Sequence, residues 1–159
     1  MVAEPGGALG VLELDIRPMD SGDLTAVAQL ERESYEFPWS EGIFRDSLRV
    51  GYYCSVLTFD PIIAGYSVLA VGAGEAHILN VCVRREFRAR GLGGRLLDHL
   101  IDQARDAGAG TLFLETRPSN LSAIRLYHSK SFVQIGIRRG YYQAAGGRED
   151  AIVMRRPLF

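Results

Sequence analysis

The stretch Arg84-Arg85-Glu86-Phe87-Arg88-Ala89-Arg90-Gly91-Leu92-Gly93-Gly94-Arg95 is the most informative part of this chain. It follows a mostly apolar segment, 77–83, and precedes leucines that recur at helical spacing. The unpaired N–H groups and positive dipole end of a helix start attract anions. Glycines at 91, 93 and 94 would let a phosphate approach the backbone, and five arginines add positive potential. The stretch predicts an anion-binding loop; the alternative is a glycine-rich turn with a solvated basic face.

The segments around this loop alternate between strand and helix patterns. We expect strands over 77–83, 111–115 and 132–137, a helix over 92–104 that ends at Gly108, and a helix from Ser119 or Asn120 to about Lys130. Such a strand–helix–strand–helix–strand run requires an α/β fold with at least one parallel crossover.

The N-terminal half adds further elements. Residues 1–10 are expected to be a flexible tail, and 11–159 a single domain that begins with a strand containing Leu12, Leu14 and Ile16. A helix capped by Asp20 or Ser21 should end before 37–39, and Ser40 should cap a second one. Strands 52–59 and 62–71 form a hairpin, and strands 132–137 and 151–155 enclose a polar loop.

Composition excludes several classes of protein. The chain has 159 residues and a net charge of −1, which argues against broad binding of nucleic acid or membrane surfaces. The longest uncharged stretch, 61–74, is too short to span a bilayer, and no signal peptide is visible. The three histidines lack metal-ligand spacing, so no metal is expected. Cys54 and Cys82 are interpreted as free, buried thiols in a reducing cytoplasm rather than as a disulfide.

The glycine loop is not a familiar nucleotide motif. GxxxxGK[ST] is absent, and no GxGxxG precedes a suitably placed acidic ribose partner. A nucleoside triphosphate or NAD is therefore disfavoured, and some other phosphate-bearing ligand is favoured.

Two side chains are candidates for proton transfer. Glu115 ends an almost wholly apolar strand, where burial on both faces would raise its pKa towards neutrality and suit a general base. The alternative is an ion pair with Arg117 on the same strand face. Tyr127 shares a helix face with Asn120 and Ala123, and residue type alone leaves open whether it is a core residue or a proton donor.

The loop and its surroundings resemble a known superfamily. Arg88-Ala89-Arg90-Gly91-Leu92-Gly93 matches the [QR]xxGx[GA] pattern of the GNAT acyl-CoA-dependent N-acetyltransferases. The stretch 114–132 resembles the LExRxSNxxAIxLYxxxGF signature of the bacterial ribosomal-protein alanine N-acetyltransferases of RimI type. Three further stretches also resemble these enzymes: FPWS at 37–40, RRGYY at 138–142 and GREDA at 147–151. The resemblance covers roughly 12–156. One departure is Ser131, where relatives usually have glycine.

The resemblance implies an α/β fold of GNAT type: a mixed, mainly antiparallel central sheet with a parallel pair and flanking helices. It implies acetyl-CoA as co-substrate, with Glu115 as proton acceptor and Tyr127 as proton donor. Coenzyme-binding residues would be Val81, Cys82, Val83, Arg88, Ala89, Arg90, Gly91, Leu92, Gly93, Gly94 and Asn120; substrate-binding residues would be Phe37, Trp39, Tyr141 and Tyr142, the tyrosines beginning the late loop.

By the same resemblance, the chain acetylates the N-terminal alanine of a small-subunit ribosomal protein in the cytoplasm, without contacting nucleic acid or membrane. Three alternatives remain: acetylation of a small-molecule amine, a coenzyme A-binding module without catalysis, and an RNA-binding domain indicated by the arginines. Trp39 could instead be a lid on the core, and Glu149 and Asp150 could either attract a basic peptide or solvate a loop. Cys82 is interpreted as a packed strand residue rather than a nucleophile.

Overall fold

The computed structural model describes residues 13–159, and its centre is a seven-stranded sheet in the order β1-β2-β3-β4-β5-β7-β6. In this sheet only β4 and β5 run parallel; all other neighbours are antiparallel. This arrangement confirms the predicted mixed sheet and its parallel crossover. The strands are β1 (Leu14–Pro18), β2 (Tyr53–Phe59), β3 (Ile62–Gly72), β4 (Glu75–Val83), β5 (Thr111–Thr116), β6 (Val133–Ala144) and β7 (Gly147–Pro157).

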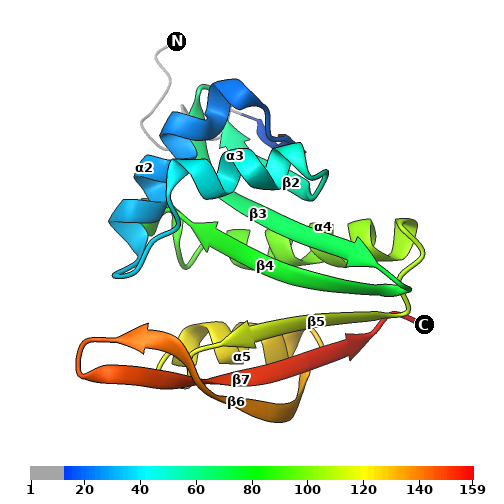
Figure 1. The fold of residues 1–159 in the computed structure, drawn as a ribbon. Helices are drawn as coiled ribbons and strands as arrows, with labels where there is room; N and C mark the ends of the chain where they lie inside the picture. The colour runs from blue at the N-terminus through cyan, green and yellow to red at the C-terminus, as the bar shows by residue number, and fades with distance from the viewer. Residues whose placement is uncertain (1–12) are drawn as a thin grey trace.

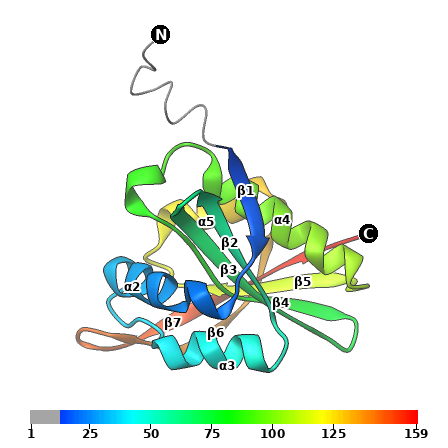
Figure 2. The ribbon, with the colours of Figure 1, turned by 90° about the horizontal axis from the view of Figure 1, so that it is seen from above.

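Helices cover both faces of the sheet (Figures 1 and 2). One face carries α2 (Leu24–Ser34) and α3 (Glu41–Arg49); the other carries α4 (Leu92–Asp106) and α5 (Leu121–Ser129). Short 3-10 turns, η1 (Ser21–Asp23) and η2 (Arg85–Phe87), precede α2 and α4. The predicted cap Ser40 accepts a hydrogen bond from the Ile43 N–H, 3.3 Å away, at the start of α3. The predicted helices and strands are therefore confirmed, and apart from the last two strands their ends differ by only a few residues.

Two main apolar clusters fill the space between sheet and helices. Under α2 and α3, Val27, Phe44 and Tyr66 are completely buried. Under α4 and α5, Leu100, Leu112 and Met154 are likewise completely buried. The sheet is thus fixed from both sides, which gives the ends of β4 and β5 a rigid support.

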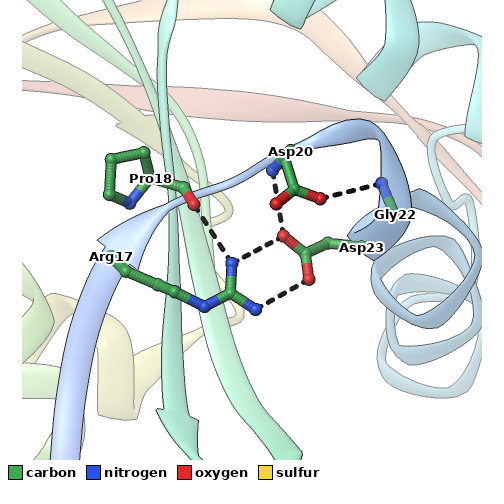
Figure 3. A network of polar contacts seen from close by, with 5 residues as sticks. All are labelled: Arg17, Pro18, Asp20, Gly22 and Asp23. Carbon is green, nitrogen blue, oxygen red and sulfur yellow. Dashed lines mark hydrogen bonds and ion pairs between the residues drawn. The ribbon is translucent and has the colours of Figure 1, made fainter.

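An ion pair ties the first strand to the first helix (Figure 3). Arg17 donates two hydrogen bonds of 2.8 Å to the Asp23 carboxylate. Asp20 completes a capping box with Asp23, and its side chain accepts from the Gly22 N–H at 2.8 Å. Bidentate pairs have a defined geometry, so this contact fixes where α2 leaves the sheet edge.

The predicted tail, 1–10, and Leu12 of the first strand lie outside the described residues. The expected polar loop after residue 137 is wrong: β6 and β7 continue as a long hairpin that turns at 145–146, and Tyr141 and Tyr142 lie within β6. Between residues 138 and 150 this hairpin has no fully buried residue, so that part lacks the apolar alternation by which strands are predicted.

Candidate active site

The parallel strands β4 and β5 separate towards their carboxyl ends (Figure 1). Their pairing runs from Glu75↔Thr111 to Ile78↔Leu114 and then stops. On its other side β4 stays paired with β3 as far as Val83. Backbone groups of β4 beyond Ile78 are therefore not used by β5. The predicted coenzyme-contacting residues Val81, Cys82 and Val83 lie on this unpaired part.

The glycine loop joins the end of β4 to the start of α4. Gly91 is the N-cap residue of α4 and has φ = +76°, a left-handed conformation that L side chains rarely adopt. Because Gly91 has no side chain, no side-chain cap closes the start of α4. The N–H groups of Leu92, Gly93 and Gly94 in the first turn have no partner within the helix. An added Cβ at Gly91 would meet no protein atom within 4 Å. This helix start has the geometry of an anion site.

Gly93 and Gly94 have a packing role that the sequence does not reveal. A Cβ at Gly93 would lie 3.1 Å from Leu126 Cδ2, and one at Gly94 would lie 3.5 Å from Lys130 Cε. The lack of a side chain at Gly93 therefore permits close packing of α4 against α5. Room for a ligand is not the only reason for glycine there.

Arginines of the loop are also partly engaged in the fold. Arg84 donates from Nε to the Ile63 carbonyl at 3.0 Å, and Arg88 donates to the Val83 carbonyl at 2.9 Å. Arg90 lies over the ring of Phe87, 5.7 Å from its centroid. These contacts tie the arginines of the loop to β3, to the end of β4 and to η2.

Glu115 lies near the end of β5 with its side chain 6% exposed. Its Oε2 lies 2.6 Å from His77 Nε2 on β4, and its Oε1 accepts from Arg138 Nη1 on β6 at 3.3 Å. Burial alone would raise the pKa of this carboxyl. The hydrogen bond and charge of His77, the charge of Arg138 and a hydrogen bond from Tyr141 outweigh burial, and the pKa is lowered from its usual 4.5.

Two expectations about Glu115 are therefore wrong. The predicted rise of its pKa does not occur, because β5 is buried on one face only and its other face brings Glu115 to charged neighbours. The alternative ion pair with Arg117 is also not formed. The strand ends at Thr116, so residues 115 and 117 no longer share a strand face, and Arg117 pairs with Glu149 instead at 3.0 Å.

Tyr127 lies on α5 and is 8% exposed. Its ring packs against Phe132 with centroids 5.9 Å apart, so it is a core residue whatever else it does. Burial raises the pKa of its phenol to about 12. Tyr127 is therefore protonated at neutral pH and can donate a proton.

Aromatic residues from two distant segments meet around Arg117. The guanidinium lies 4.5 Å from the ring centroid of Tyr142 and 5.9 Å from that of Phe37. The Glu149 carboxylate on β7 accepts a hydrogen bond from the Arg117 guanidinium and another from the Ser119 N–H at 3.2 Å. Glu149 is thus engaged within the fold rather than merely solvating a loop.

Tyr141 and Tyr142 are neighbours in the same bulged part of β6, with ring centroids 5.0 Å apart. Arg138 lies 4.5 Å from the centroid of Tyr141. Asp150 accepts from the Gly140 N–H at 2.8 Å, which holds the bulge in place. From this bulged part of β6, Arg138 donates to the Glu115 carboxylate at 3.3 Å.

Trp39 is half-buried and packs on Phe44 with centroids 5.2 Å apart. Its backbone N–H donates to Glu31 Oε2 at 2.9 Å, and Glu31 also accepts from Asn80 at 2.9 Å and from the Tyr66 hydroxyl. These contacts agree with the alternative in which Trp39 covers the core; a role in substrate binding stays a prediction.

Asn120 and Cys82 also have structural roles. The Asn120 side chain caps α5 by accepting from the Ala123 N–H at 3.3 Å, as predicted for a helix start. Cys82 and Cys54 are buried free thiols, as expected. Among residues 13–159, no three His, Cys, Asp or Glu side chains are grouped to hold a metal ion, and no helix is long and apolar enough to cross a membrane.

Sequence reasoning missed two residues at this site. His77 contacts Glu115, and the Tyr35 hydroxyl donates to the Val81 carbonyl at 2.8 Å where β4 leaves β5. Both contacts join residues more than 35 positions apart, so no local spacing could have indicated them. Only the strand register would have placed His77 beside Glu115.

Sequence comparisons point to one family. The sequence model of the protein family described as "Acetyltransferase (GNAT) family" matches residues 24–132 of this chain. A Salmonella typhimurium protein named ribosomal protein bS18-alanine N-acetyltransferase is 42% identical over 140 residues, which cover 88% of this chain and 95% of the relative. A protein of that name in Escherichia coli K12 is 39% identical over 143 residues, 90% of this chain and 97% of the relative.

Solved structures agree. The crystal structure of the ribosomal-protein-S18-alanine N-acetyltransferase from Escherichia coli superposes with a TM-score of 0.85 at 38% identity, covering 92% of this chain and 94% of that one. Ard1 from Thermoplasma volcanium gives a TM-score of 0.83 at 25% identity, covering 92% and 98%.

Proposed function

The chain belongs to the GNAT acetyltransferase family, and on this premise we propose that it acetylates the N-terminal alanine of a ribosomal protein in the cytoplasm. It is an N-acetyltransferase that uses acetyl-CoA. The observation that carries the acceptor assignment is an identity of 39–42% with enzymes of that printed specificity over 88–90% of this chain.

The coenzyme fits the glycine loop and the split in the sheet. Unpartnered N–H groups of Leu92, Gly93 and Gly94 can receive a pyrophosphate, since Gly91 leaves the space before them open. The unpaired edge of β4 at 81–83 would bind the pantetheine arm and hold the thioester oxygen through a backbone N–H. Arg88, Ala89 and Arg90 would line the phosphate end, and Asn120 would contact the coenzyme from the start of α5.

Glu115 would accept the proton of the acceptor amine, directly or through water. A peptide α-ammonium has a pKa of about 7.7–8.0, so much of it must lose a proton at pH 7 before it can attack. The lowered pKa of Glu115 keeps the carboxylate ionised, so that it attracts the ammonium group. The same lowered pKa makes the carboxylate a weak base that does not keep the proton. The proton must therefore move on to another group.

Tyr127 would protonate the departing coenzyme A thiolate. Its phenol stays protonated at neutral pH because burial raises its pKa to about 12. Bound acetyl-CoA supplies the activated acetyl group, so no covalent acyl-enzyme is needed. The buried Cys82 has no proposed role as nucleophile.

The acceptor peptide would enter between the α2–α3 connection and the β6–β7 hairpin. Phe37, Tyr141 and Tyr142 lie around Arg117 and Arg138 at this point, and Trp39 supports the connection from the core side. Aromatic rings with hydroxyl groups can hold an extended backbone with little dependence on its side chains.

The test is thiol release from acetyl-CoA with a panel of acceptors: peptides beginning with Ala, Ser or Met, one Ala peptide with a blocked N-terminus, and spermidine. We expect turnover with the free Ala peptide and none with its blocked form. Turnover confined to spermidine would replace the proposal with a small-amine acetyltransferase, and coenzyme binding without turnover on any acceptor would refute it.

A further inference from the structure

His77 stands out because it contacts the proposed base yet has no assigned role. It pairs in register with Phe113 on the neighbouring strand, and Glu115 follows two positions later. Since alternate residues of a strand share a face, His77 and Glu115 point to the same side of the sheet. Their side chains meet at 2.6 Å between Nε2 and Oε2.

A groove of about 470 Å³ runs over this face and exposes the pair to solvent. Its walls include the apolar side chains of Val71, Phe113 and Val153. The His77 side chain is 36% exposed, whereas that of Glu115 is 6% exposed. The imidazole therefore lies between a nearly buried carboxylate and the open groove.

The charged and polar neighbours of the pair come from two strands, β4 and β6. Arg138 of β6 donates to the other oxygen of Glu115 at 3.3 Å. Its guanidinium lies 4.5 Å from the ring centroid of Tyr141 on the same strand. Glu75 of β4 lines the groove beside His77. Arg138 cannot accept a proton, and Tyr141 is itself a donor. His77 is the neighbour of Glu115 whose imidazole can accept a proton at one ring nitrogen and release one from the other.

We propose that His77 is a proton-relay and positioning residue, which takes from Glu115 the proton lost by the acceptor amine and releases it into the groove. An N–H bond of the ammonium breaks as an O–H bond forms on Glu115. The proton then passes from Oε2 to His77 Nε2, and the resulting imidazolium gives its Nδ1 proton to water. Exchange with groove water restores the Nδ1–H tautomer. No electrons are transferred.

This inference rests on the proposed function, because it assigns a destination to the proton that Glu115 accepts. It also explains how a carboxylate with a lowered pKa serves repeated turnovers. The carboxylate attracts and orients the amine, and the imidazole then removes the proton from the carboxyl group.

The experiment compares His77→Gln and His77→Ala with wild type on the free Ala peptide. Gln keeps a hydrogen-bond donor beside Glu115 but cannot relay a proton. We expect both variants to lose roughly 10- to 100-fold in kcat with unchanged acetyl-CoA affinity, a loss at the low end of proton-transfer effects. Added imidazole should raise kcat of His77→Ala in proportion to its concentration, and wild type should not respond.

His128→Ala is the matched control, since His128 is exposed on α5. It should keep wild-type kcat. The pH profile of kcat/KM provides a second readout: its acidic limb should change in both His77 variants and stay unchanged in His128→Ala. If His77→Ala does not fold, the same imidazole titration is made on His77→Gln.

Wild-type kcat in His77→Gln would overturn the relay, and so would a loss that imidazole fails to restore, since that pattern indicates a purely structural contact. A wild-type enzyme that acetylates no peptide would instead refute the proposed function. The two failures are therefore distinguishable.

Discussion

The guanidinium of Arg117 lies 4.5 Å from the ring centroid of Tyr142, and this contact joins the residue that follows β5 to the C-terminal end of β6. The same guanidinium lies near Phe37, so three segments distant in sequence form one wall. Each cation–π contact contributes about 0.5–2 kcal/mol. The wall stands where the acceptor peptide is proposed to enter.

Arg117→Ala should therefore weaken acceptor binding more than it slows chemistry. Without the guanidinium, Phe37 and Tyr142 lose their shared partner, and we expect KM for the Ala peptide to rise roughly tenfold, the equivalent of about 1.4 kcal/mol. Steady-state kinetics should give a nearly unchanged kcat. Arg125→Ala, at an exposed position on α5, is the control. A fall in kcat with constant KM would contradict this role.

Glu115→Gln should reduce kcat by about 10²-fold or more, because the amide cannot accept the amine proton. Calorimetry should give an unchanged affinity for acetyl-CoA. The sign of the pKa change adds a second expectation: a carboxyl with its pKa lowered from 4.5 is ionised at all higher pH values. Wild-type kcat/KM should therefore show no titration of Glu115 between pH 5 and 9. Loss of coenzyme affinity in the variant would indicate a structural glutamate.

Tyr127→Phe should slow the chemical step while leaving both substrates bound. The phenol proton is removed but the ring still packs on Phe132, and we expect kcat to fall by about 10²-fold. Because the pKa of Tyr127 is about 12, wild type should show no decline assignable to this residue below pH 10. Rapid-mixing measurements of the acetyl-transfer step would check both points. Wild-type turnover in Tyr127→Phe would exclude it as the acid.

Gly91→Asp should abolish acetyl-CoA binding. It places a negative charge and a side chain before the N–H groups of the first turn of α4, at φ = +76°. Gly91→Ala introduces the backbone strain without the negative charge, because a non-glycine residue in the left-handed region costs about 1–2 kcal/mol of stability. Gly146→Asp, where an added Cβ meets nothing within 4 Å, should bind normally in the same calorimetric titration. Normal binding in Gly91→Asp would show that the coenzyme lies elsewhere.

Ser131→Gly should stabilise the protein without changing its activity. Ser131 has φ = +70° after α5, so a side chain is held in a region that glycine occupies freely. Relief of about 1–2 kcal/mol is partly offset by the greater unfolded-state entropy of glycine, about 0.4–1 kcal/mol. We expect a Tm a few degrees higher by thermal unfolding. An unchanged or lower Tm would mean that the serine conformation carries no strain.

Much of the fold was predictable because its signals are local. Asp20, Ser40 and Asn120 cap helices where the sequence places them, and strand and helix periodicities appear wherever one face of an element is buried. The hairpin of β6 and β7 was predicted too short because its part between residues 138 and 150 has no fully buried residue and no periodicity marks it.

For the site, the sequence determined the glycine loop between β4 and α4 and its place at a helix start, because helix-start chemistry depends on neighbouring residues. By resemblance, it also indicated Glu115 and Tyr127 as proton-transfer candidates. Only the tertiary structure decided which charges meet Glu115. His77 is 38 residues away, and the register of two parallel strands joined through α4 sets that contact. Arg117 is only two residues away, but β5 ends between the two residues and the Arg117 side chain pairs with Glu149 instead. Sequence separation does not measure distance once strands pair, and the pKa of a buried carboxyl follows the neighbours it meets in space.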